Sequence, residues 1–218
     1  MKVALKSFRR YLVIFIVLVV LLGIYSATQS QLLDVDEIEV VITGGSEVSQ
    51  DEIIALSGIR LSQAMVSVDS SKAESYIFKN PWVAEVEVSK EWPNGVSIWV
   101  SSRTAFAYVV TIEGKFATID INGIVLESSR IDSSANLVTL LVEKLSEPGT
   151  RVDGVETLLE AAKSVTPDLR KWVKIISPTA SGVRVELDDS VFVNLGMHED
   201  FTNAVSYTHL TLPTNREV

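Results

Sequence analysis

The sequence predicts an α+β fold in which a single membrane-spanning helix precedes two folded modules. Three observations lead to this prediction: a long apolar run near the start, a strand–helix–helix–strand–strand pattern over residues 35–103, and a second, β-rich pattern over residues 104–205. The chain has 218 residues, of which 47% are hydrophobic, so it can build two small cores in addition to an anchor.

The strongest local signal is a β-hairpin. Apolar and polar side chains alternate over residues 83–90 and again over residues 96–100, which is the period of a half-buried strand. Between them, Trp92-Pro-Asn-Gly95 reverses the chain, because proline presets φ and Asn-Gly accepts positive φ. A lone hairpin is unstable in water, so this one requires the helices predicted just before it.

The rest of the first module is predicted as one strand and two short helices. Residues 38–42 form the strand, and a capping box at Ser49-Gln-Asp-Glu52 opens a helix that ends at Gly58. Asp69 or Ser70 caps the second helix, which ends at Asn80-Pro81 because proline cannot continue it. In the connector between the helices, we expect the apolar side chains of Leu61, Met65, Val66 and Val68 to be buried. In the second helix, Ala73, Tyr76 and Ile77 are expected to share one face.

The second module is predicted to be richer in strands. Strands are expected at residues 106–112, 116–119, 124–126, 137–142, 172–176, 183–187 and 191–195, and a helix at residues 155–165. Turns are expected at Glu113-Gly114 and at Asn122-Gly123, of which the second is a hairpin signal.

An uninterrupted apolar run follows the first ten residues. It comprises Tyr11, Leu12, Val13, Ile14, Phe15, Ile16, Val17, Leu18, Val19, Val20, Leu21, Leu22, Gly23, Ile24 and Tyr25. With Ser26 and Ala27, it would reach ~25 Å as a helix, close to a ~30 Å hydrocarbon core. Basic residues precede the run and acids follow it, so we expect residues 1–10 in the cytoplasm, residues 11–27 in the cell membrane and the bulk of the chain outside.

This run has two other interpretations. A cleaved signal peptide has the same layout, but its apolar region is usually about 7–15 residues long and is followed by small residues at the cleavage site. A buried core helix would show a polar face, which this run lacks. The uncleaved anchor is therefore the preferred prediction.

Composition excludes several classes of function. The net charge is −9, and the first ten residues are basic, so the acidic excess lies in the rest of the chain and disfavours nucleic-acid binding. The chain has no cysteine, and its two histidines, His198 and His209, lie near the C-terminal end. No phosphate loop, metal-spaced cluster or nucleophile elbow occurs, so we expect no enzymatic activity, no cofactor, no metal and no small-molecule substrate.

Aromatic and basic side chains suggest surfaces rather than chemistry. Of Trp82, Trp92 and Trp99, we expect Trp82 to pack in the core and Trp92, at the turn, to be exposed. The lysines Lys72, Lys79 and Lys90 could bind an acidic partner, but scattered lysines are usually a solvated face. Residues 206–218 continue neither the helical nor the strand pattern and are interpreted as foreign to the domain, with an ordinary C-terminus as the alternative.

Taken together, these motifs resemble the FtsQ/DivIB family of bacterial cell-division proteins. The matching stretches are Ile38-Glu-Val-Val-Ile-Thr-Gly44, Ser49-Gln-Asp-Glu-Ile-Ile54, Asn80-Pro-Trp-Val-Ala-Glu-Val-Glu-Val88, Trp92-Pro-Asn-Gly95, Val100-Ser-Ser-Arg103 and Phe116-Ala-Thr-Ile-Asp-Ile-Asn-Gly-Ile-Val125. Ser102 stands where the family often has an acid.

The resemblance implies a POTRA module over residues 35–103 and a β-rich FtsQ/DivIB-type domain over residues 104–205, incomplete at its C-terminal end. It also implies a non-enzymatic scaffold of the divisome at the division septum, which links early and late division proteins and helps to control septal peptidoglycan synthesis. Its partners would be the lipid bilayer and FtsB/FtsL-type coiled-coil division proteins. The candidate partner-binding residues are Trp92, Val191, Phe192, Val193, Asn194 and Leu195.

Two alternatives belong to other classes. A membrane-anchored POTRA protein of an assembly or secretion system would show several POTRA repeats, which the sequence lacks. A tethered cell-wall hydrolase would need a nucleophile, a base or a metal in one cleft, and the sequence offers no such set.

Overall fold

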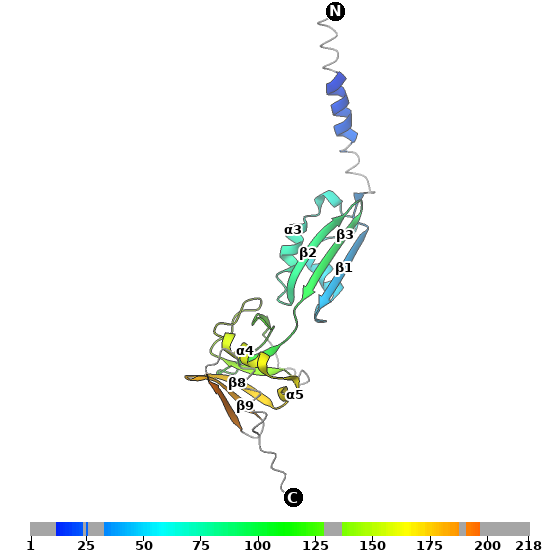
Figure 1. Ribbon diagram of the computed structural model, residues 1–218. Helices are drawn as coiled ribbons and strands as arrows, with labels where there is room; N and C mark the ends of the chain where they lie inside the picture. Colours follow the sequence, from blue (N-terminus) through cyan, green and yellow to red (C-terminus); the bar gives the residue numbers. More distant parts are fainter. Residues whose placement is uncertain (1–11, 24, 26–32, 129–136, 188–190, 197–218) are drawn as a thin grey trace, which may run out of the picture. The chain divides into compact units, whose positions relative to one another are not determined.

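The computed structural model describes residues 12–23, 25, 33–128, 137–187 and 191–196 (Figure 1). Residues 12–23 are helical, and their large apolar side chains are exposed, from 47% for Leu12 to 65% for Leu22. Tyr11, Ile24, Ser26 and Ala27 of the predicted anchor lie outside the described residues.

Within the described residues, no helix has both the length and the apolar character needed to cross a membrane.

The folded part of the chain divides into two compact units. The first unit holds β1 (Glu37–Gly44), α2 (Gln50–Ser57), the 3-10 helix η2 (Met65–Ser67), α3 (Ser70–Ile77), β2 (Val83–Glu91) and β3 (Gly95–Ser102). The strands form one sheet in the order β1-β3-β2. The predicted strand–helix–helix–strand–strand order is thereby confirmed.

The predicted helix caps are also confirmed. Ser49 Oγ accepts a hydrogen bond from Glu52 N at 3.2 Å, and Gly58 follows α2 in the left-handed conformation with φ of 68°. Asp69 rather than Ser70 caps α3, with its Oδ1 accepting from Lys72 N at 3.0 Å. Each cap satisfies an amide that the helix itself leaves unpaired.

The predicted burial is wrong at two positions of this unit, Leu61 and Val66. Met65 and Val68 are buried, but Leu61 is 62% exposed and Val66 is 55% exposed. Leu61 lies in a turn, and the three-residue η2 is too short to direct two neighbouring side chains inward. Tyr76 is 38% exposed at the margin of the α3 face that buries Ala73 and Ile77.

The second unit is a seven-stranded sheet with one covering helix. Its elements are β4 (Ala107–Thr111), β5 (Phe116–Ile119), β6 (Val125–Glu127), β7 (Val138–Val142), α4 (Glu156–Ser164), α5 (Pro167–Arg170), β8 (Val173–Thr179), β9 (Gly182–Leu187) and β10 (Phe192–Gly196). The sheet order is β10-β9-β8-β7-β4-β5-β6. Parallel pairing of β7 with β4 and β8 makes the sheet mixed.

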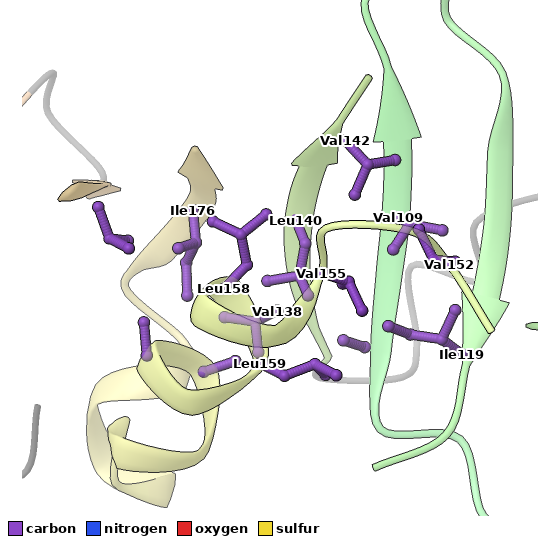
Figure 2. Packing of buried hydrophobic residues seen from close by; sticks show 14 of the residues in the cluster. Val109, Ile119, Val138, Leu140, Val142, Val152, Val155, Leu158, Leu159 and Ile176 are labelled. Carbon is purple, nitrogen blue, oxygen red and sulfur yellow. The ribbon is translucent and has the colours of Figure 1, made fainter. Parts of the chain in front are cut away.

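Helix α4 packs its buried side chains into the core of this unit. Leu158 and Leu159 belong to the same buried cluster as Leu140 and Ile176 of the sheet, and all four side chains are at most 2% exposed (Figure 2). The predicted helix at residues 155–165 is confirmed, whereas α5 was not predicted and begins with proline at its first turn. Trp172, placed in a strand by the prediction, lies just before β8 and is 50% exposed.

Candidate functional site

The two ends of the seven-stranded sheet differ in what covers them. At the β6 end, Val125 N donates to Thr150 O at 2.9 Å, and Gly149 N donates to Val125 O at 2.8 Å. A bridge between Ile124 and Arg151 continues this cover. The chain therefore closes its own sheet at β6.

The other end of the sheet is β10. It pairs antiparallel with β9, and Leu187 N donates to Val191 O at 2.8 Å where the hairpin closes. In the described part of the chain, no segment pairs with the far side of β10. Among the described residues, this strand is therefore an open edge, with backbone groups that face no other described strand.

In an antiparallel pair, successive residues direct their backbone groups alternately toward the partner strand and away from it, which shows which groups of β10 face outward. Val191 directs its carbonyl toward β9, so Val193 does the same and Phe192 and Asn194 direct their amides to the open side. The outward amides of Phe192 and Asn194 are the groups that an added strand would use.

Several side chains at this edge are exposed. Phe192 is 55% exposed and Val191 is 44% exposed. Arg184 of β9 faces Asn194 across the strand pair, and its Nε donates to Asn194 Oδ1 at 3.2 Å. The Arg184 guanidinium carbon lies 5.8 Å from the centre of the Phe192 ring. The edge thus combines an apolar ring with a positive charge, a combination common in protein interfaces.

The structure places the predicted partner-binding residues in different settings. Val191, Phe192 and Asn194 lie exposed at the open edge, Val193 is half-buried, and Leu195 is 6% exposed in the core cluster. Leu195 can therefore offer a partner only its backbone. Trp92 belongs to the first unit, after the last residue of β2, and is 57% exposed as expected.

Sequence reasoning missed Arg184. The alternation of Val183, Val185 and Leu187 already puts Arg184 on the opposite face of β9, but only the pairing register shows that Asn194 is its neighbour.

The three lysines considered for an acidic partner lie in two different settings. Lys72 and Lys79 lie 5.8 and 4.9 Å from the Tyr76 ring centre. Lys90 Nζ instead donates to Met65 O at 3.0 Å.

A small cavity of about 280 Å³ lies between the turn at residues 121–124 and helix α4. Its charged side chains are already paired, Arg151 with Glu156 at 3.5 Å and Lys163 with Glu160 at 3.0 Å. The described ranges hold no group of three or more His, Cys, Asp or Glu side chains placed to bind a metal. His198 and the Asp188-Asp189 pair lie outside those ranges.

Comparison with known proteins matches the first unit to a domain family and longer parts of the chain to named relatives. A family model described as "POTRA domain, FtsQ-type" matches residues 38–103. The "Cell division protein FtsQ" of Streptomyces griseus is 31% identical over 162 residues, which cover 69% of this chain and 76% of that protein. The "Cell division protein DivIB" of Clostridium acetobutylicum is 27% identical over 127 residues, covering 57% of this chain and 51% of that protein.

The "Cell division protein FtsQ" of Bradyrhizobium diazoefficiens is 33% identical over 88 residues, which cover 40% of this chain and only 25% of that longer protein. The FtsQ-type POTRA module and these named relatives indicate a bacterial cell-division protein. The chain belongs to the FtsQ/DivIB family of bacterial cell-division proteins.

Proposed function

We propose that this protein is a non-enzymatic, single-pass scaffold of the division septum, which links early and late division proteins and helps to control septal peptidoglycan synthesis. Family membership supports a role in cell division. The open edge at β10 supports a binding role, because a scaffold acts through docked partners rather than through a reacting side chain.

The anchor is proposed to be residues 11–27, with residues 1–10 in the cytoplasm. The helical residues 12–23 support this, since their side chains are uniformly apolar and exposed to the surroundings. Such a surface is unfavourable in water and favourable in hydrocarbon.

Partner binding is proposed to occur by strand addition at β10. The single observation that carries this proposal is the contrast between the two sheet ends: residues 149–151 cover β6, whereas the outward amides of Phe192 and Asn194 face no described strand. An extended segment from an FtsB/FtsL-type coiled-coil partner would gain affinity from these backbone groups, and Phe192 with Arg184 would add side-chain contacts.

A proline substitution tests the backbone contact. Asn194→Pro removes an amide on the open side without removing a bond to β9, so the sheet should persist while strand addition fails. Asn194→Ala is the matched control, because it loses the same side-chain contact with Arg184 but keeps the amide. The measurement is co-purification of the coiled-coil partners with the full chain, together with midcell localisation in dividing cells.

We expect the proline variant to lose partner capture by about tenfold or more relative to the alanine variant, as for removal of a buried backbone hydrogen bond. Equal capture by both variants, with the sheet intact by circular dichroism, would exclude strand addition at β10. Loss of capture in both would instead assign the contact to the Asn194 side chain.

A further inference from the structure

The POTRA sheet also has two edges, β1 and β2, and a helical side chain contacts the backbone of each. Glu74 of α3 accepts a hydrogen bond from Val88 N on β2, with 2.9 Å between Oε1 and the amide. Gln50, the first residue of α2, donates from Nε2 to Val40 O on β1 at 2.8 Å. Both contacts occupy polar backbone groups in the middle of an edge strand.

The contact at β2 is the stronger of the two. A carboxylate that accepts a backbone amide makes a charge-assisted bond, about twice as strong as a neutral one. A partner strand could offer Val88 N only a neutral carbonyl, and it would leave the displaced Glu74 carboxylate without that bond. Lys90, two residues further along β2, is tied by its Nζ to Met65 O at 3.0 Å, so two side chains join this edge to the helical layer.

The edge at β1 is closed over part of its length by backbone as well. Just before β1, Val35 N donates to Gln63 O at 2.8 Å, and Ser62 N donates to Val35 O at 2.8 Å. A bridge pairs Asp34 with Ala64. An added strand would therefore meet an occupied backbone before β1 and the Gln50 amide at its centre.

We infer that Glu74 and Gln50 are specificity-determining residues, which close both edges of the POTRA sheet against strand addition. Side chains that cap an edge are one way in which proteins prevent unwanted pairing of sheets. The consequence that strand addition is confined to β10 rests on the proposed function, whereas the closure of β2 and β1 does not.

Glu74→Ala in the full chain, held in detergent micelles, tests the closure of β2. Removing the acceptor frees Val88 N, so its amide exchange should accelerate by about tenfold, the effect of one lost hydrogen bond to a charged group. Glu87→Ala is the matched control, because Glu87 lies on the same strand, is exposed and carries the same charge. Its substitution should leave Val88 exchange unchanged.

A second readout detects pairing between copies. The chain has no cysteine, so Ser89→Cys places a single thiol at an exposed position on β2. Under mild oxidation, a β2-to-β2 dimer should accumulate in the Glu74→Ala background and not in the Glu87→Ala background. Gln50→Ala alone, which uncovers only β1, should not produce this β2-to-β2 dimer.

Wild-type exchange at Val88 together with no dimer in Glu74→Ala would overturn the inference. If Glu74→Ala fails to fold, Glu74→Leu decides, because leucine keeps most of the side-chain volume and cannot accept a hydrogen bond from Val88 N. Faster Val88 exchange in this variant supports the inference, and wild-type exchange contradicts it. No partner protein takes part in these measurements, so their failure leaves the β10 proposal standing, and failure of the Asn194→Pro test leaves the closure of β2 standing.

Discussion

At the scale of single residues, one ion pair stands out from the others by its burial. Arg103 and Asp120 lie 2.7 Å apart, and their side chains are 16% and 4% exposed. The second carboxylate oxygen of Asp120 accepts from Asn122 N at 2.9 Å and from Ile124 N at 2.8 Å. Asp120 therefore holds both Arg103 and the turn between β5 and β6.

We predict that Asp120→Ala destabilises the protein by about 3 kcal/mol, because it leaves a largely buried guanidinium and two turn amides without their partner. The loss in the free energy of unfolding is measured by urea denaturation, followed by the fluorescence of the second unit. The exposed pair of Glu113 and Lys115 provides the control. The hydrogen bond from Lys115 lowers the pKa of Glu113, but both side chains are solvated. Glu113→Ala should therefore not change stability measurably. A comparable loss in both variants would contradict the structural role of Asp120.

At the scale of elements, the turn after β5 is fitted to helix α4. Gly123 has φ of 81°, and a Cβ atom there would lie 2.8 Å from Val155 Cγ1 and 3.0 Å from Leu159 Cδ1. Gly114, in the turn after β4, has nearly the same φ of 80° but nothing within 4 Å of the corresponding position. The two turns therefore separate backbone strain from steric overlap.

We predict that Gly114→Ala costs about 1–2 kcal/mol, the strain of a left-handed backbone in an L-residue. Gly123→Ala should cost about 1–3 kcal/mol more, because α4 must also shift away from the turn. Thermal or urea unfolding of the two variants checks this order. Equal losses would mean that α4 yields without cost, and the packing argument at Gly123 would then be wrong.

At the scale of the whole molecule, the proposed role requires two separate attachments, one to the bilayer and one to partners. The helical residues 12–23 are proposed to provide the first, and the β10 edge the second. A defect in either attachment should leave the other intact, since they lie in different parts of the chain.

We predict that Leu18→Arg weakens membrane insertion, because an arginine near the centre of a spanning helix costs about 2.5–3.5 kcal/mol. Carbonate extraction of membranes followed by immunoblotting measures the fraction that remains inserted, and Leu18→Ile is the control of similar volume. Full retention of the arginine variant in the extracted membrane would contradict the proposed anchor.

Much of the fold could be predicted because its signals are local. The Ser49 and Asp69 caps, the Asn122-Gly123 turn and the alternation of β3 act within a few residues, and the structure confirms them. Leu61 and Val66 were placed wrongly, since burial in a short connector depends on the direction of the backbone rather than on hydrophobicity. The same limit applies to Trp172, whose large apolar side chain is 50% exposed.

For the candidate site, local sequence patterns alone predict that residues 191–195 alternate as a strand and that Trp92 stands at a turn. Only the folded structure shows that β10 is the outermost described strand of the sheet, that Arg184 is the neighbour of Asn194, and that Leu195 belongs to the core. Edge position, cross-strand neighbours and edge-capping side chains such as Glu74 all depend on contacts between residues distant in the chain. Local patterning carries no record of such contacts, because they form only when the sheet is assembled.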